Sequence, residues 1–494
     1  MKKKVVTTIG PLLSIVLNKG YILKIESAIL NNSDQIKYYP EKLLGEGVEK
    51  KFYATCNPDF VIGFYKDREG KKDTERLKRL LNIVDKYNPG SNKEEKKYWG
   101  NFFSWPLAIV TNPRIGILCP RFPEKYYFKE IKSEKKAKWF STQRLSGRTT
   151  DGLSFDLLKR LKVCRHLSKA VSRMHMAGLC HSDLSGNNIL MDPVTATCML
   201  IDIDSLVVPG LFPAKVLGTK GYCAPEVIAT SHLPLKHPQK KLPSISTDLH
   251  ALSVIIYETL LMRHPFVGQR VHSKDPEEDD LLLFGKRALF IEHPEDKSNR
   301  PSWLHLSIDT LRPYLSKLFI KSFVDGLKDP YKRPTAMAWE KALTKTMDLL
   351  HPCKGKECKQ KWFVYQQNQE PKCPDCNTLV PHEVPVMHLF DRHKNGQYIS
   401  TQHYITIYNQ RPIFNWHTCY NIPYPDENET GHGVQGIFFQ SSKKWQFKNV
   451  SGRRNFCFPF LNIKKGGFID LSNEQMIILN PSPNGRVGMI VYGK

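Results

Sequence analysis

Acidic and amide residues at a fixed spacing between residues 181 and 226 constrain this chain more than any other feature. The run His181-Ser182-Asp183-Leu184-Ser185-Gly186-Asn187-Asn188 places an amide five residues after an acid, and an apolar strand then leads to Asp202. A carboxylate can orient an acceptor hydroxyl, while an amide and a second carboxylate can hold Mg²⁺ on nucleotide phosphates. The pattern therefore predicts metal-assisted phosphoryl transfer, with Asp183 as the base and with Asn188 and Asp202 as Mg²⁺ ligands.

The chain around this motif changes from β-rich to helical. Residues 40–66 alternate glycine with β-forming residues and predict a hairpin and a third strand, followed by a helix over 73–87 and strands over 105–110 and 116–120. Beyond residue 150 the sequence predicts long helices over 157–176 and 247–261. With Ala224-Pro225-Glu226 after the second acid, this order resembles the protein kinases and implies their bilobal α+β fold over residues 40–349, with the small lobe ending near residue 120.

The resemblance also implies scaffold residues. Glu226 is expected to form a buried ion pair with Arg333 of the run Asp329-Pro330-Tyr331-Lys332-Arg333-Pro334-Thr335. Asp248 matches the acid that braces the catalytic loop from the following helix.

The nucleotide site of the small lobe is less clearly defined. Gly45 and Gly47 resemble a phosphate-covering loop, in which glycine lets the backbone approach the phosphates closely. Leu118 and Cys119 are expected on the strand and hinge that accept the adenine. Lys66 is a candidate for the phosphate-binding lysine. Lys50 or Lys51 could reach in instead, or the site is impaired. Glu75, on the expected helix, is either the partner of that lysine or a solvated helix charge.

Three positions depart from the family pattern. Ser182 replaces the arginine that usually precedes the base, and Ser185 replaces the lysine two residues after it. Asp204 stands where the family has glycine, as an extra carboxylate near the metals or as a turn acid. If Val61 lies under the adenine, the position of the phosphate-binding lysine is Gly63. Gly63, Ser182 and Ser185 leave a pseudokinase scaffold as an alternative to an active serine/threonine kinase.

Four cysteines form two close pairs. Cys353 and Cys358 precede Cys373 and Cys376, and fourteen residues separate the pairs. Four thiolates satisfy tetrahedral Zn²⁺ without an open position, so the spacing predicts a structural zinc ribbon over residues 350–383. His351 and His382 flank the site but are not needed as ligands.

The remaining C-terminal segment, residues 384–494, shows short strands with turn signals and predicts an all-β sandwich. The run Lys444-Trp445-Gln446-Phe447-Lys448-Asn449-Val450-Ser451 resembles a forkhead-associated domain. A protein-docking sandwich is the plainer interpretation, and phosphothreonine recognition is an alternative.

Charge and composition limit the partners and the compartment. The net charge is +25 over 494 residues, and residues 121–148 mix lysine and arginine with aromatic side chains. This stretch is either an amphipathic connector, a protein-docking surface or a nucleic-acid surface. A nucleic-acid-binding regulator is therefore a further alternative, although it is not favoured.

The start, Met1 to Gly10, is interpreted as a leading strand and not a signal peptide, and no apolar run is long enough for a membrane span. Together with the zinc-type cysteine spacing, this predicts a cytoplasmic protein.

The order of kinase core, zinc ribbon and β-rich tail, after an N-terminal extension over 1–39, resembles the bacterial eukaryotic-like kinase of the tellurite-resistance (TerY-type) phosphorylation triad. The resemblance implies ATP, Mg²⁺ and structural Zn²⁺ as cofactors. It also implies, as partners, a von Willebrand A-domain protein and a cognate protein phosphatase in a stress or phage-defence system.

Overall fold

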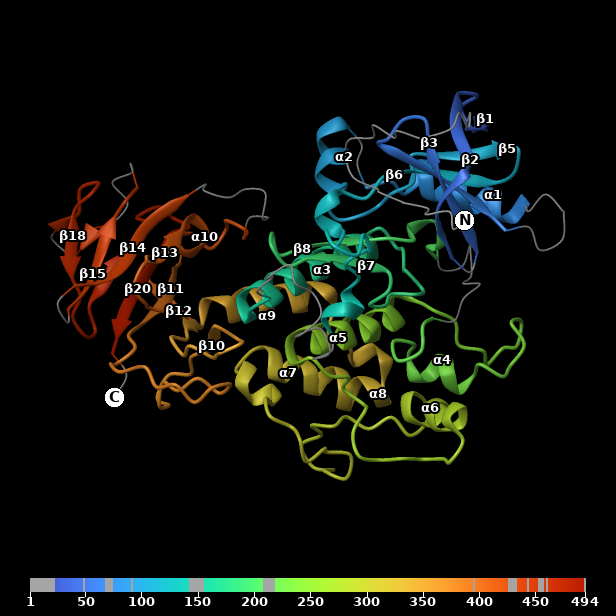
Figure 1. The fold of residues 1–494 in the computed structure, drawn as a ribbon. Helices are drawn as coiled ribbons and strands as arrows, with labels where there is room; N and C mark the ends of the chain where they lie inside the picture. The colour runs from blue at the N-terminus through green and yellow to red at the C-terminus, as the bar shows by residue number, and fades with distance from the viewer. Residues whose placement is uncertain are drawn as a thin grey trace, which may run out of the picture.

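The structure of the chain is a computed structural model (Figure 1). It describes residues 23–47, 49–66, 74–89, 92–141, 155–207, 218–393, 396–424, 433–441, 444–451, 457–458 and 461–492. The leading strand predicted within residues 1–10 lies outside these ranges.

The small lobe is a closed antiparallel barrel with the strand order β1-β2-β3-β4-β6-β5. Its strands are β1 (Glu26–Leu30), β2 (Gln35–Glu46), β3 (Lys50–Thr55), β4 (Phe60–Tyr65), β5 (Ala108–Asn112) and β6 (Gly116–Pro120). β1 pairs with both β2 and β5 and so closes the barrel. Residues 26–39 are therefore part of the small-lobe sheet, whereas the sequence analysis placed them in an extension before the domain.

Two helices lie beside the barrel. α1 (Thr74–Leu81) continues into a wider π-helical turn (Asn82–Lys86), and α2 (Lys93–Trp99) begins where the Asn92 side chain accepts the backbone N–H of Glu95. The apolar side chains of these helical turns are buried in apolar cores; they are Leu80, Ile83 and Val84. The helix expected over 73–87 is thus present as one α-helical and one π-helical piece.

The large lobe is helical and surrounds two long helices, α3 (Leu157–Met176) and α5 (Ile245–Leu261) (Figure 1). Asp156 caps α3 by accepting the backbone N–H of Lys159, and Ser244 begins α5 with a capping box. α5 is buried on almost every side, as its apolar sequence predicts. Around these two helices lie the hairpin β7 (Ile189–Asp192) and β8 (Thr197–Leu200) and the helices α4 (Pro225–Ala229), α6 (Pro276–Phe284), α7 (Leu315–Ile320), α8 (Gly326–Lys328) and α9 (Ala336–Asp348).

The remaining modules follow α9 directly. A two-stranded hairpin, β9 (Leu350–Pro352) and β10 (Trp362–Val364), carries the cysteine unit. Beyond it, one sheet has the order β12-β11-β20-β19-β16-β17 and a second has the order β13-β14-β15-β18. The two sheets share an apolar core that includes Met387, Phe438 and Phe447. The bounds are β11 (Val386–Arg392), β12 (Tyr398–Thr406), β13 (Arg411–Phe414), α10 (Asn415–Thr418), β14 (Val434–Ser441), β15 (Lys444–Asn449), β16 (Cys457–Phe458), β17 (Leu461–Asn462), β18 (Phe468–Asp470), β19 (Met476–Ile478) and β20 (Arg486–Val491).

A buried acid at the end of α9 joins the large lobe to this β-rich tail. Asp348 Oδ1 accepts hydrogen bonds from Arg411 Nη2 at 2.9 Å and His417 Nε2 at 3.0 Å, and Oδ2 lies 3.0 Å from His403 Nε2. Burial favours the neutral carboxyl, yet His417 and His403 hold the pKa of Asp348 well below its usual range. The tail is thus fixed to the helix that closes the large lobe (Figure 1).

The cysteine unit is attached to the large lobe at a different point, the start of α3. Arg160 of that helix donates to Gln360 Oε1 at 3.0 Å, and the Leu157 N–H donates to the Gln360 carbonyl. The kinase-like lobe therefore contacts both of the modules that follow it in the sequence.

Every helix in the described ranges falls short of the length and apolar character needed to cross a bilayer.

We expect Asp348→Ala to destabilise the protein by about 3–5 kcal/mol, because the change leaves the buried Arg411 guanidinium without its counter-charge. Chemical denaturation measures this loss, and limited proteolysis should show earlier cleavage between α9 and the tail. Asp470→Ala is the control and should change stability little, since the contacts of Asp470 with Lys444 and Gln446 are exposed. Equal stability of Asp348→Ala and the wild type would contradict this role.

Candidate active site and metal centre

The three predicted catalytic residues lie together at the β7–β8 hairpin. Asn188 Nδ2 donates to Asp183 Oδ2 at 3.0 Å and to the Asp183 carbonyl at 2.8 Å, so the amide oxygen of Asn188 is turned away from Asp183. Ile189 pairs with Leu200 across the hairpin, and the Ile201 N–H donates to the Asn188 carbonyl. This pairing brings Asn188 beside the segment that carries Asp202.

Asp183 also accepts a hydrogen bond that the sequence analysis did not foresee. Thr219 Oγ1 donates to Asp183 Oδ1 at 2.6 Å. The two carboxylate oxygens of the base are thus oriented separately, one by Thr219 and one by Asn188. The sequence carries no local signal for this contact, because it requires the segment before Glu226 to fold back over the catalytic loop.

The scaffold acid Asp248 braces the catalytic loop as predicted. From α5, its Oδ2 accepts the backbone N–H of His181 at 2.7 Å, and its Oδ1 accepts that of Ser182 at 3.3 Å. Ser182 adopts a left-handed backbone with φ 65°, which the two hydrogen bonds help to hold. The His181 ring donates from Nε2 to the Ile201 carbonyl at 2.9 Å and so connects the loop to the strand before Asp202.

The second predicted scaffold contact, Glu226 with Arg333, is a bidentate ion pair. Arg333 Nη1 and Nη2 lie 2.8 Å from Glu226 Oε1 and Oε2, and the Arg333 side chain is fully buried. Nearby, Tyr222 donates to Glu258 Oε2 at 2.7 Å, and burial raises the pKa of Glu258 to about 7. The Tyr222 contact holds the segment that carries Thr219 against α5, and the ion pair holds α4 against the turn before α9.

Lys50 is the small-lobe lysine that reaches the catalytic acids. Its Nζ lies 2.6 Å from Asp202 Oδ1, and 2.6 Å and 2.7 Å from the two carboxylate oxygens of Asp204. The side chain is 7% exposed. Burial alone would lower the pKa of Lys50, but the charges of Asp204 and Asp202 raise it above its usual value. The lysine therefore carries its positive charge beside the predicted metal ligand.

Lys66, the candidate that the sequence suggested for the phosphate-binding lysine, lies elsewhere. Its Nζ forms an ion pair with Glu46 at 2.6 Å, and both side chains are about one-third or more exposed. Lys51 also faces Glu46, at 3.5 Å. Successive side chains along a strand point to opposite faces of the sheet. Lys51 therefore lies on the face opposite Lys50. Lys66 likewise lies on the face opposite Tyr65, the residue that borders the Lys50 site. The structure thus places Lys50, and not Lys66, beside Asp202.

Packing between β3 and β4 explains why the lysine that reaches Asp202 lies on β3 and not on β4. In β4, the position of the expected lysine is Gly63, and a Cβ there would come within 2.6 Å of the Phe52 ring. Phe52 lies opposite Gly63, and Lys50 lies opposite Tyr65, in the antiparallel pairing of β3 with β4. The Phe52 ring therefore fills the space over Gly63, and Lys50, two residues earlier on the same face of β3, supplies the ammonium group.

The other predicted nucleotide-binding residues border this site to different degrees. Gly45 and Gly47 lie at the β2–β3 turn, where the Gly47 N–H donates to the Lys50 carbonyl, and a Cβ on either glycine would meet no atom closer than 3.9 Å. Cys119 packs in the same apolar cluster as Tyr65, whereas Leu118 turns into the barrel core. Of the two predicted hinge residues, Cys119 therefore faces the Lys50 side of the sheet.

The basic, aromatic stretch after β6 is a connector in its described part, residues 121–141. Tyr126 and Phe128 are buried, while Trp139 is 43% exposed. Lys136 bridges to Leu190 of β7, and the Lys138 N–H donates to the Gly186 carbonyl. This stretch thus packs beside the catalytic loop.

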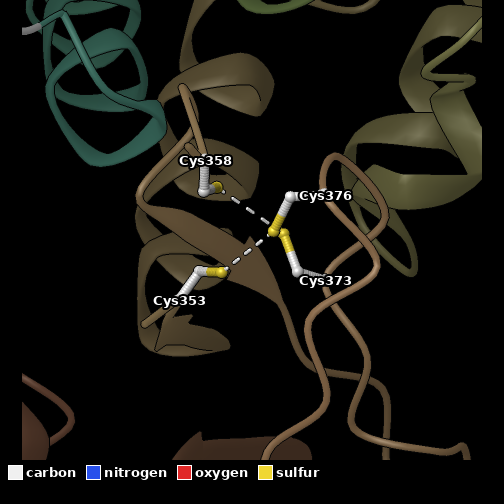
Figure 2. A group of neighbouring side chains, drawn as sticks. All are labelled: Cys353, Cys358, Cys373 and Cys376. Atoms are coloured by element: carbon white, nitrogen blue, oxygen red, sulfur yellow. Dashed lines mark hydrogen bonds between the residues drawn. The ribbon is translucent and has the colours of Figure 1, made fainter. Parts of the chain in front are cut away.

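The four predicted zinc ligands converge at one point (Figure 2). The sulfur atoms of Cys353, Cys358, Cys373 and Cys376 all lie within 4.8 Å of one another. A Cβ on Gly355 would approach Cys376 Sγ to 2.7 Å, so the turn between the first two cysteines accepts only glycine. Four converging sulfur atoms in so tight a cradle are compatible with tetrahedral Zn²⁺.

Comparison with known proteins agrees with the geometry of the large lobe. Residues 138–344 match the model of the protein kinase domain. The serine/threonine-protein kinase PknD of Chlamydia felis is 29% identical over 146 residues, which are 24% of this chain and 15% of that protein. The serine/threonine-protein kinase mos of Patiria pectinifera is 26% identical over 160 residues, 31% of this chain and 40% of that protein. A solved structure described as "ROP18 kinase domain in complex with AMP-PNP and sucrose" covers 66% of this chain and 84% of that chain, at 16% identity and a TM-score of 0.43.

The family match and the site define the class. Residues 138–344 therefore form a protein kinase domain. The two curated relatives are serine/threonine-protein kinases, and the matched part spans less than half of their length. The predicted kinase fold is confirmed.

We expect Lys50→Ala to weaken Mg-ATP binding roughly tenfold or more, because it removes the buried charge beside the phosphate site. Lys66→Ala is the matched control, and it should change binding little because Lys66 forms an exposed ion pair. Titration with a fluorescent ATP analogue measures both affinities. A loss in Lys66→Ala without a loss in Lys50→Ala would restore the original assignment.

We expect the purified protein to contain about one Zn²⁺ per chain, and Cys373→Ser to lose it. Removal of the metal should lower the melting temperature, because the cysteine unit is anchored to α3. Elemental analysis and thermal unfolding measure the two effects. Cys56→Ser is the control, since Cys56 is an exposed free cysteine outside the cluster. Metal-free protein with an unchanged melting temperature would argue against a structural zinc site.

Proposed function

We propose that the chain is an active protein kinase that transfers the γ-phosphoryl group of ATP to serine or threonine of a partner protein. The observation that carries this proposal is the contact of Lys50 with Asp202 across the two lobes. The usual strand lacks a lysine, which favoured a pseudokinase in the sequence. Lys50 supplies the missing charge from the neighbouring strand.

Each residue of the site then has a role. Asp183, oriented by Thr219 and Asn188, accepts the proton of the substrate hydroxyl as the oxygen attacks phosphorus. Asn188 and Asp202 offer the oxygen donors that Mg²⁺ prefers. Mg²⁺ bound there would neutralise charge on the phosphates. Lys50 contacts the phosphates next to the metal ligand.

The modules after the kinase domain support a role in partner selection. Asp348 fixes the β-rich tail to α9, and Arg160 of α3 contacts the cysteine unit. We propose that the ribbon and the tail hold a protein substrate at a fixed position relative to the catalytic loop. The forkhead-associated resemblance of the tail remains a prediction.

The resemblance to the TerY-type triad narrows this proposal further. It assigns the substrate as a von Willebrand A-domain protein, opposed by a cognate phosphatase, in a cytoplasmic stress or phage-defence system. The order of kinase domain, cysteine unit and β-rich tail supports this assignment.

Phosphotransfer from γ-labelled ATP tests the proposal. The wild type should label itself or a protein acceptor on serine or threonine. Asp183→Asn should lower the rate by roughly 10²–10⁴-fold while its nucleotide affinity remains close to that of the wild type. Nucleotide binding by both proteins with transfer by neither would instead identify a pseudokinase.

A further inference from the structure

Asp204 makes the most extensive contact with the small-lobe lysine. Both of its carboxylate oxygens lie within 2.7 Å of Lys50 Nζ, whereas Asp202 contributes one oxygen. The Asp204 side chain is 4% exposed, and that of Asp202 is 40% exposed. The more buried carboxylate thus belongs to the residue that stands where other kinases have glycine.

The helix of the small lobe does not provide this carboxylate. In other protein kinases, the phosphate-binding lysine pairs with a glutamate from that helix. Here Glu75 of α1 is exposed, and among the described residues Lys50 pairs with Asp202 and Asp204. α1 instead places the Arg76 guanidinium 4.3 Å from the centre of the Tyr65 ring, and Arg79 is buried. The carboxylates that pair with Lys50 come instead from the segment after β8.

Tyr65 holds Asp204 in place. Its hydroxyl donates to Asp204 Oδ2, and the ring is buried at the end of β4, directly opposite Lys50 in the strand pairing. Asp204 itself belongs to a short 3-10 turn (Ile203–Ser205) that follows Asp202 in the large lobe. The cluster therefore joins two small-lobe strands to the large lobe.

The different exposure of the two acids separates their roles. Asp202 is the accessible carboxylate and can turn from Lys50 toward a metal. Asp204 is enclosed by Lys50 and Tyr65, so it can remain with the lysine when Mg-ATP binds.

We propose that Asp204, held by Tyr65, is a positioning residue that directs the Lys50 ammonium toward the ATP phosphates in place of the helix glutamate. Because the ion pair crosses the cleft, closure of the lobes itself completes the phosphate site. This inference rests on the proposed function, since it assigns a role within the same reaction.

The test compares Asp204→Asn, Asp204→Glu and Tyr65→Phe with Glu75→Gln as the matched control on α1. Affinity for a fluorescent ATP analogue, KM for ATP, kcat and the Mg²⁺ concentration for half-maximal rate are measured for each, with thermal unfolding to verify folding. Asp204→Asn should weaken ATP binding and raise KM roughly tenfold or more, since it removes a charge-assisted contact of Lys50. Asp204→Glu should recover part of the affinity, Tyr65→Phe should show a smaller loss, and Glu75→Gln should match the wild type.

Several results would overturn the inference. The first is an ATP affinity within about twofold of the wild type in both Asp204→Asn and Tyr65→Phe. The second is a loss of ATP affinity in Glu75→Gln. The third is a shift in the Mg²⁺ requirement of Asp204→Asn with unchanged ATP affinity, which would make Asp204 a metal ligand. If Asp204→Asn does not fold, Tyr65→Phe decides. If the wild type binds the analogue but transfers no phosphate, the proposed function fails, while the binding measurements still decide the role of Asp204.

Discussion

The ion pair of Lys50 with Asp202 and Asp204 is the contact on which the rest of the site depends. It joins β3 of the small lobe to the turn after β8 in the large lobe, and its Lys50 and Asp204 side chains are almost entirely buried. A buried charge of this kind must be fully paired, because leaving one partner alone costs several kcal/mol. The requirement fixes the relative position of the two lobes and places a positive charge beside the predicted metal ligand.

In the large lobe, hydrogen bonds between residues that are close in the chain hold the catalytic groups in place. Asp183, Asn188 and the hairpin that follows are close in the chain, and Asp248 of α5 holds the loop before them through the His181 N–H. Because their positions depend on spacing within a short segment, the sequence alone indicated that Asp183, Asn188 and Asp202 lie close together, as they do in the structure. The zinc ligands were predictable for the same reason, since two close pairs of cysteines need only a short hairpin to converge.

The small lobe was harder to predict, because the lysine position depends on strand register and on cross-strand packing. The pairing of β3 with β4 places the Phe52 ring over Gly63 and places Lys50 opposite Tyr65. This pairing cannot be read from any single stretch of sequence. Lys50 was named among the possibilities, whereas Lys66 was the candidate chosen for the site. Asp204 was noted as a possible extra carboxylate and Thr219 was given no role, because their partners lie 154 and 36 residues away in the chain.

The central claim is that Lys50, and not Lys66, contacts the ATP phosphates. An acyl-phosphate derivative of ATP transfers its acyl group to a lysine beside the bound phosphates, and mass spectrometry of the digested protein then locates the modified residue. The account predicts modification of Lys50 that excess Mg-ATP prevents and that Asp204→Asn reduces. Modification of Lys66 that Mg-ATP prevents, with Lys50 unmodified, would contradict it.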